Sequence, residues 1–254
     1  MKNNASDING LETDTEVMTH CLDKLTSDLW YSVRRYYVDT FFFRHIENFS
    51  SGQSILDMGG KKTNKRGEFD IEKYDLDVKY ANLDEATNPD YACDLVAIPV
   101  GDNSFDGVIL SEVLEHVPEP VNVLREASRV LNPGGKLLIC TPFMFPVHAD
   151  PYDFGRYTDY WFQIALDAIG FQHIHIEKQG LFFSVLANML KTWGYQLEQT
   201  GRPSKSWKKG AFHRAIFWVV KNSFIWEKNP FYREHNVFAG YTTGYGIVCE
   251  KPIA

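Results

Sequence analysis

The chain has 254 residues, which is enough for one large α/β domain or for one domain that carries an insertion. Hydrophobic residues make up 44% and charged residues 23%, values ordinary for a globular protein and not for a fibrous or disordered one. The formal net charge of −7 argues against a general nucleic-acid binder, because a surface that follows phosphates must be basic.

The cysteines and the N-terminal segment bear on the compartment. The four cysteines are scattered, with no C-x-x-C pair and no metal-ligand spacing, so a reducing, cytoplasmic location and no metal centre are expected. The polar, acidic start lacks the apolar core of a signal peptide, and we expect residues 1–15 to be disordered. No apolar run approaches the roughly 20 residues of a membrane span, so no stable membrane insertion is expected.

Apolar residues recur at intervals of three and four between residues 15 and 49, which predicts helix. A short apolar strand at 54–58 then runs into Gly59 and Gly60, and the polar, basic segment 61–67 is expected to be a loop. Further apolar runs predict strands at 78–83, 105–110, 136–141 and 171–177, with a weaker one at 91–94, and helices at 120–131 and 158–170.

This alternation predicts an α/β fold, with a Rossmann-like, doubly wound, mostly parallel seven-stranded sheet. Two helix-like stretches, 181–190 and 215–226, precede a final strand at 241–250, so a helical insertion before the last strand is expected. The predicted division is a core with N-terminal helices over 16–180, an insertion over 181–238 and the final strand over 239–254.

The insertion is rich in aromatic and basic residues, which leaves its purpose open. It could form a lid or an acceptor pocket, touch a membrane surface near a lipid-linked substrate, or pack on the domain or on a second subunit in a homodimer. The aromatic residues concerned are Trp193, Tyr195, Trp207, Phe212, Trp218 and Trp226.

The first strand ends in Asp57-Met58-Gly59-Gly60, a pattern typical of nucleotide sites. Glycines permit a tight turn and a close approach of ligand to backbone, and the helix expected next would add partial positive charge. Asp84 ends the following strand, where nucleotide folds place an acid on the ribose hydroxyls. Each feature alone also occurs at ordinary strand ends.

Three further segments carry a family resemblance. Residues 93–106 (CDLVAIPVGDNSFD), 112–117 (EVLEHV) and 129–135 (RVLNPGG) follow one another at the spacing of the class I S-adenosylmethionine-dependent methyltransferases, particularly the type 11 group. The resemblance covers roughly residues 54–178 and implies an enzyme that transfers a methyl group from S-adenosylmethionine. The most similar subset is often associated with glycan or cell-surface biosynthesis.

The resemblance implies a cofactor site at the strand ends. The Asp57–Gly60 turn would hold the amino-acid portion of the cofactor, Leu83 and Asp84 the ribose, and Asp94 with Leu95 the adenine. Ser111 and Glu112 would border the methionine end. In the E-H pair Glu115-His116, the histidine would face the acceptor or order the loop.

The family's first motif usually carries more glycines than this chain has. Lys61 and Thr63 stand at the later glycine positions, within the basic run Lys61–Arg66. The run is either a solvated loop or, through Lys61 and Arg66, a binding site for an anionic acceptor such as a phosphorylated or nucleotide-linked sugar.

Residues 141–157 (TPFMFPVHADPYDFGRY) resemble a segment found in part of the family. His148 is the first candidate for a general base, with Asp150 or Asp153 orienting it, because imidazole suits deprotonation of a hydroxyl near neutral pH. It could equally be a structural loop histidine. Arg156 could clamp an anion or pair with Asp153. The remaining candidates at the acceptor are His116 for catalysis and Tyr152 and Tyr157 for binding.

The sequence therefore predicts a methyltransferase for a small-molecule or glycan acceptor, methylated at oxygen. A binding or scaffold protein that has lost catalysis is the alternative, supported by the degraded glycine motif. A nicotinamide-dependent dehydrogenase is disfavoured, because the glycines are too few for a pyrophosphate.

Overall fold

The computed structural model describes residues 6–63, 65–200 and 206–253. Within these ranges the chain forms two compact units. Residues up to Arg44, Gly67–Phe69 and Gly180–Thr243 make the helical unit, and the other residues make the sheet unit.

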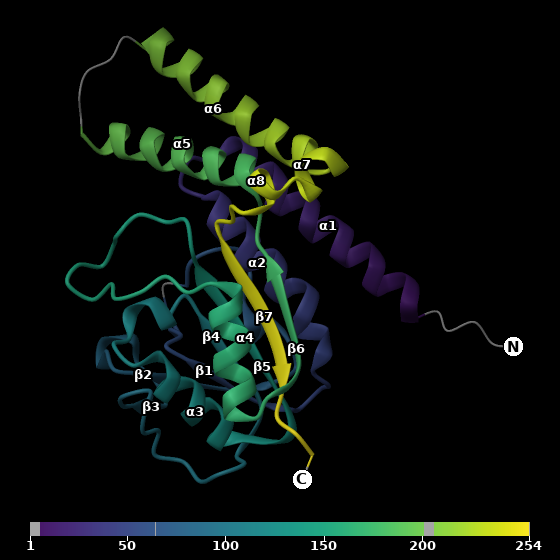
Figure 1. Ribbon diagram of the computed structural model, residues 1–254, viewed down its shortest axis with the longest axis vertical. Coiled ribbons are helices and arrows are strands. Elements are labelled where there is room, and N and C mark those ends of the chain that lie inside the picture. Colours follow the sequence, from purple (N-terminus) through teal and green to yellow (C-terminus); the bar gives the residue numbers. More distant parts are fainter. Residues whose placement is uncertain (1–5, 64, 201–205, 254) are drawn as a thin grey trace, which may run out of the picture. The chain divides into compact units, whose positions relative to one another are not determined.

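The sheet unit contains one seven-stranded sheet in the order β3-β2-β1-β4-β5-β7-β6 (Figure 1). Strand β7 is antiparallel to both of its neighbours, while the pairings among β1 to β5 are all parallel. The strands are β1 (Ser54–Met58), β2 (Asp77–Asn82), β3 (Tyr91–Ala92), β4 (Phe105–Ser111), β5 (Leu131–Pro142), β6 (Gln172–Lys178) and β7 (Gly244–Glu250). The predicted α/β class and mostly parallel sheet are confirmed.

Two helices pack on the sheet, and local sequence explains where each begins and ends. Helix α3 (Pro120–Val130) starts with proline at its first turn, where the missing N–H costs nothing. Helix α4 (Asp159–Ile169) is capped by the Thr158 hydroxyl, which accepts from the N–H of Trp161, and ends at Gly170 with φ +104°. Short 3₁₀ turns η1 (Ile46–Asn48), η2 (Ile71–Lys73), η3 (Glu85–Thr87) and η4 (Leu114–His116) complete this unit.

The helical unit contains α1 (Ser6–Ser27), α2 (Val33–His45, whose last residue belongs to the sheet unit), α5 (Phe182–Gln199), α6 (Ser206–Glu227), α7 (Pro230–Glu234) and α8 (Asn236–Ala239). Its core joins the N-terminal helices to the late ones, because Leu25 and Val33 pack in one buried cluster with Ala187 and Val220. Helices α5 and α6 lie side by side (Figure 1). No helix among the described residues is long and apolar enough to cross a membrane.

The structure differs from the predicted division in two places. Helix α1 begins at Ser6, so residues 6–15 are helical and not disordered; residues 1–5 lie outside the described ranges. The N-terminal helices belong to the helical unit and not to the core, because their apolar faces pack on α5 and α6. Helices α5 to α8 do stand between β6 and β7, as the predicted insertion required.

The single helical pattern predicted over 15–49 is interrupted. The Asp28 carboxylate accepts from the N–H of Trp30 at 2.8 Å, a local turn that competes with the helix and separates α1 from α2. The apolar pattern does not reveal this turn, because Leu25 before it, Leu29 within it and Val33 after it are all buried at helical spacing.

The ring of Phe162, on α4, is fully buried in the core of the sheet unit. We expect Phe162→Ala to lower the free energy of unfolding by about 3–5 kcal/mol, because it removes apolar contacts and leaves a cavity. Denaturant unfolding followed by circular dichroism measures the change. Ile164→Ala on the same helix is the control, because Ile164 is 70% exposed, and an equal loss there would contradict the assignment.

Candidate active site

The candidate site lies at the point where the strand order changes direction. From β1 the chain continues to β2 and β3 on one side, whereas β4 and β5 extend the sheet on the other side. In open α/β sheets the loops that leave such a switch point at the carboxyl ends of the strands form a crevice for ligands. Here those loops are the glycine turn after β1 and the segment that follows Ser111 of β4.

Both glycines of the turn after β1 are required by their surroundings. Gly59 has φ +89°, a conformation rare for other residues, and a Cβ there would lie 2.5 Å from Cγ2 of Val113. A Cβ on Gly60 would overlap the carboxylate of Asp57. The turn therefore brings its backbone against two side chains that flank the switch point.

Asp57 is the charged group at the centre of this turn. Its Oδ1 atom is buried and has no hydrogen-bond partner among the described residues. Burial raises the pKa of the Asp57 carboxyl to about 7, although the nearby Lys65 ammonium opposes the shift. A buried carboxylate oxygen left unsatisfied by the protein is suited to a donor supplied by a ligand.

The helix expected after the glycine turn is not observed. Among the described residues between β1 and β2, the only helical element is the short turn η2, so no α-helix N-terminus faces the turn. The run from Lys61 to Gly67 contains no apolar side chain, which leaves a helix there without a face to bury. The predicted contribution of a helix dipole is therefore wrong.

Asn82, which the sequence interpretation missed, holds the turn in place. Its side-chain Nδ2 donates to the carbonyl oxygens of Gly59 and Gly60, at 3.0 Å each, and its Oδ1 accepts from the N–H of Asp84 at 2.9 Å. One amide thus connects the glycine turn to Asp84, the acid that follows β2. An asparagine directly before Leu83-Asp84 was the available signal.

Asp84 and Asp94 occupy the positions predicted for them, each exposed in a loop after a strand. One oxygen of Asp84 accepts from the N–H of Ala86 at 3.0 Å, and Asp94 similarly accepts from Val96 at 3.2 Å, so both side chains are oriented by local turns. Leu83 is 74% exposed, which leaves an apolar surface beside Asp84, whereas Leu95 is buried.

The loop after β4 carries backbone strain next to the switch point. Glu112 follows Ser111 with φ +56°, a conformation uncommon for a residue other than glycine, and its N–H donates to the carbonyl of Cys140 at 2.9 Å. The next turn, η4, contains Glu115 and His116. The Glu115 side chain is fully buried, and its Oε1 lies 3.6 Å from Nε2 of His116.

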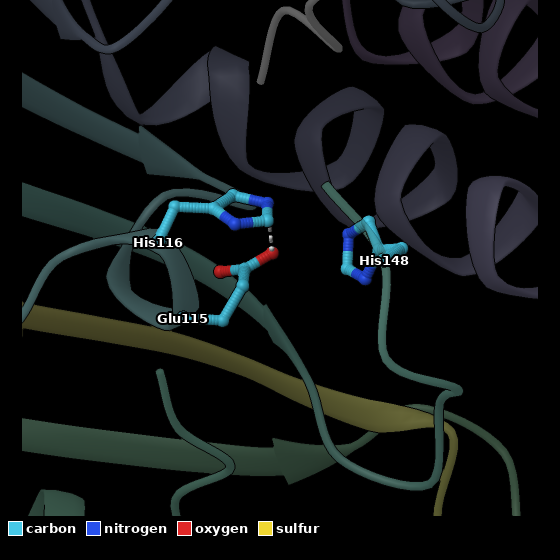
Figure 2. Close-up of side chains that lie close together, drawn as sticks. All are labelled: Glu115, His116 and His148. Carbon is cyan, nitrogen blue, oxygen red and sulfur yellow. Dashed lines mark ion pairs between the residues drawn. The ribbon is translucent and has the colours of Figure 1, made fainter. Parts of the chain in front are cut away.

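The loop after β5 brings His148 beside this pair. The ring centroids of His116 and His148 lie 4.9 Å apart, with the rings edge to face (Figure 2). Nδ1 of His148 lies 3.3 Å from Oδ2 of Asp153, which also accepts from the His148 N–H at 2.8 Å. Asp153 is the partner of His148 in the structure. Asp150, the other candidate, is exposed and precedes the cis peptide bond to Pro151.

Arg156 pairs with Asp153. Its two terminal nitrogens donate to the two carboxylate oxygens at 2.5 and 2.8 Å, a bidentate geometry that holds the pKa of Asp153 well below its usual range. Of the two predicted uses of Arg156, the structure shows the pairing with Asp153.

The two tyrosines of this segment have different surroundings. The Tyr152 side chain is 65% exposed, and its backbone carbonyl lies 2.7 Å from Nδ1 of His116. The ring of Tyr157 packs on Trp161 with centroids 4.3 Å apart, and burial raises the pKa of its hydroxyl. Tyr152 is therefore available to a ligand, whereas Tyr157 supports the packing of α4.

The basic loop is partly neutralised by acids of the sheet unit. Lys62 pairs with Asp90 at 2.7 Å and Lys65 with Asp70 at 2.6 Å. Lys61 and Arg66 are exposed and form no ion pair with any residue in the described ranges. Of the cations described in the run, these two remain for an anionic ligand.

Comparison with known proteins identifies the segment that contains most of these groups. Residues 61–139 match the family model described as "Methyltransferase domain". The matched segment is less than a third of the chain. The matched segment includes Asp84, Asp94 and the Glu115-His116 pair, while the glycine turn precedes it and His148 follows it.

Two curated relatives are similar to parts of this chain. The chain is 35% identical to the demethylmenaquinone methyltransferase of Renibacterium salmoninarum over 96 residues, which are 35% of this chain and 40% of the relative. It is 50% identical to the ubiquinone biosynthesis O-methyltransferase of Xanthomonas oryzae pv. oryzae over 48 residues, 19% of each protein. The chain thus spans less than half the length of these relatives.

Solved structures share the fold over most of the chain. The cyclase SpnF superposes with a TM-score of 0.56 at 16% identity, and the superposition covers 87% of this chain and 81% of the SpnF chain. A SAM-dependent methyltransferase from Archaeoglobus fulgidus gives 0.52 at 14% identity, over 85% and 94% of the two chains. At these identities the likeness establishes the fold alone.

Proposed function

We propose that this protein is an S-adenosylmethionine-dependent methyltransferase that acts on an oxygen atom of a small molecule. The observation that carries the proposal is the continuous arrangement of Asp57, the glycine turn, Asn82 and Asp84 at the switch point, the last two within the segment that matches the methyltransferase family model. Bound there, the cofactor would supply an electrophilic methyl group on a sulfonium sulfur.

The residues present fit this cofactor. The buried Oδ1 of Asp57, which lacks a partner, is suited to the ammonium of the cofactor's amino-acid portion, and the absence of side chains at Gly59 and Gly60 lets the ligand reach the backbone. Asp84 offers a carboxylate for the ribose diol, with exposed Leu83 beside it, and Asp94 offers an acceptor for the adenine amino group.

The acceptor would lie near Glu115, His116 and His148, which follow β4 and β5 at the same edge of the sheet. Alignment of nucleophile, methyl group and sulfur would be the protein's main task, together with removal of the acceptor's proton. The His148 imidazole, oriented by Asp153, can take that proton directly or help to hold a group that lowers the acceptor's pKa. Asp150 is assigned no role in this step.

The chemical class of acceptor rests on two observations. The curated relatives are named for menaquinone and ubiquinone biosynthesis, and one of them is named an O-methyltransferase, which supports a small acceptor methylated at oxygen. The exposed cations Lys61 and Arg66 favour an acceptor with a negative charge, and a phosphorylated or nucleotide-linked sugar would provide one. Replacing both by Gln should raise KM for the acceptor more than Kd for the cofactor; equal losses would contradict this role.

A nicotinamide cofactor fits the site less well. A dinucleotide pyrophosphate needs a helix N-terminus after the glycine turn, and none is found in the described residues between β1 and β2. The likeness to a cyclase shows that the fold also serves other chemistry, so methyl transfer must be measured separately from binding.

The deciding experiment combines binding with transfer. Calorimetry should show binding of S-adenosylmethionine and none of NAD, and Asp84→Ala should weaken cofactor binding about 10- to 100-fold through loss of charge-assisted hydrogen bonds. Labelled cofactor incubated with extracts of the source organism should then yield a methylated product. Cofactor binding without transfer to any extract would favour a scaffold protein, and binding of neither cofactor would overturn the proposal.

The pKa of Asp57 predicts a pH-dependent affinity for the cationic cofactor. With a pKa of about 7 in the ligand-free protein, the carboxylate is mostly charged at pH 8 and about one-tenth charged at pH 6, so binding should weaken about tenfold over that interval. The raised pKa also means that the carboxyl stabilises the ligand-free fold at low pH and that this contribution is lost as the pH rises through about 7. Calorimetry at four pH values measures how the affinity for the cofactor changes with pH. Asp57→Asn should abolish this pH dependence, and an unchanged pH dependence in the variant would contradict the role of Asp57.

A further inference from the structure

One group of three side chains combines ligands of the kind that divalent metal ions prefer. Glu115, His116 and His148 each offer a nitrogen or oxygen atom, and these atoms lie within 4.8 Å of one another. Figure 2 shows the Glu115 carboxylate facing the His116 ring on the η4 turn, with the His148 ring beside them on the loop after β5. The sequence suggested no metal centre, because His148 lies on a different loop from the adjacent Glu115 and His116.

Both imidazoles are held through the same nitrogen. Nδ1 of His116 lies 2.7 Å from the carbonyl oxygen of Tyr152, to which it can donate. Nδ1 of His148 lies 3.3 Å from both Oδ2 of Asp153 and the carbonyl oxygen of Pro146. A proton on each Nδ1 leaves both Nε2 lone pairs available, the tautomer that histidine ligands adopt when a carboxylate or carbonyl holds the other nitrogen.

The carboxylate completes the set. Glu115 is fully buried, and its Oε1 lies 3.6 Å from Nε2 of His116, close to the spacing of two ligands around one ion at about 2.1 Å from each. The backbone carbonyl of Glu115 also accepts from the N–H groups of Phe154 and Gly155, which ties the loop of His148 to the turn of Glu115. The charge of Asp153 is countered by Arg156, so Glu115 supplies the negative charge of the cluster.

We propose that Glu115, His116 and His148 bind one divalent transition-metal ion of the zinc class. Two imidazoles and one carboxylate form a ligand set that zinc uses in catalytic sites, where further coordination positions remain open. Asp153 and the Tyr152 carbonyl are the outer partners that fix the two rings.

The consequence for catalysis rests on the proposed function. An acceptor hydroxyl that takes an open position on the ion loses its proton to solvent more readily. The oxygen then attacks the methyl carbon, the carbon–oxygen bond forms, and the carbon–sulfur bond breaks with its electron pair left on sulfur. In this route His148 would serve as a ligand and not as the general base, and the ion would lower the acceptor's pKa so that solvent can take the proton.

The test measures metal binding without cofactor or acceptor. Full-length protein is freed of metal with a chelator and titrated with Zn²⁺ in a calorimeter, and its Co²⁺ form is examined by visible absorption. One equivalent of metal should bind to the wild type. Asp153→Asn should weaken binding about 10- to 100-fold, as loss of an outer partner does, and His148→Ala and Glu115→Gln should weaken it further.

Two matched controls make the result decisive. Asp150→Asn changes an exposed acid in the same loop, and His175→Ala changes a histidine of β6; both should bind Zn²⁺ like the wild type. Absence of a stoichiometric site, or a site that survives His148→Ala in protein with an unchanged thermal transition, overturns the proposal. Metal binding in a protein that transfers no methyl group would instead overturn the proposed function and leave the metal site established.

Discussion

Replacement of His148 by alanine is expected to lower kcat for methyl transfer by about 10²–10⁴-fold, the usual contribution of a positioned acid–base group. Both ways of activating the acceptor, direct proton transfer and coordination of a metal ion, require this imidazole. Because His148 lies in a loop and is partly exposed, the fold should tolerate the change, and the affinity for S-adenosylmethionine should remain within about twofold, well below the loss expected for a direct contact. Steady-state kinetics with the identified acceptor, together with calorimetry, measures both quantities.

Variants of neighbouring acids separate the two candidates for the partner of His148. Asp153→Asn should lower kcat, since it weakens the contact that orients the ring, whereas Asp150→Asn should leave kcat near the wild-type value. Asp153→Asn also loses half of the bidentate pair with Arg156, so its thermal transition must be measured beside its activity. A larger effect of the Asp150 variant would contradict the assignment made from the structure.

Replacement of Gly60 by alanine is expected to weaken binding of S-adenosylmethionine by about 10- to 100-fold, equivalent to the loss of one hydrogen bond to a charged group. The new methyl group would occupy the space of the Asp57 carboxylate and displace it from the turn. The fold should survive, because the displaced atoms are the end of a side chain and not backbone. Calorimetry at pH 8, where Asp57 is ionised, measures the change.

The same overlap predicts strong coupling between the two positions. In an Asp57→Ala background the carboxylate is absent, so Gly60→Ala should cost little more, and the double variant should bind like Asp57→Ala alone. If the losses of cofactor affinity in the two single variants add in the double variant, the methyl group at position 60 hinders the ligand itself and does not act by displacing Asp57. Gly101→Ala is a suitable control, since neither Gly60 nor Gly101 has positive φ and a Cβ on Gly101 would meet only Oγ of Ser104, at 3.8 Å.

The local sequence was sufficient for most of the sheet unit. The apolar residues 107–110 and 137–140, within the strands predicted at 105–110 and 136–141, indicated β4 and β5, because a strand buried on both faces has no polar side. The acids at strand ends, Asp57, Asp84 and Asp94, were also predicted correctly as loop or strand-end positions, since parallel strands bring their carboxyl ends to one edge.

Side-chain partners depended on tertiary structure. The sequence offered Asp150 and Asp153 equally, and only the path of the loop through Ala149, at φ +55°, placed Asp153 beside His148. Asn82 contacts glycines more than 20 positions earlier, and no local pattern reports such a contact. The division into units likewise depended on which apolar faces met, as with Leu25 and Val220.

The sequence by itself determined the α/β class, the strand-end positions of the acids and the methyltransferase resemblance of residues 94–141, because strand periodicity and strand-end chemistry are local properties. Tertiary structure decided two things. It showed that a glycine turn without a following helix is held by Asn82 and Val113, and that Glu115, His116 and His148 meet in one cluster. These contacts join separate loops, and their geometry follows from how the strands pair and not from any short stretch of residues.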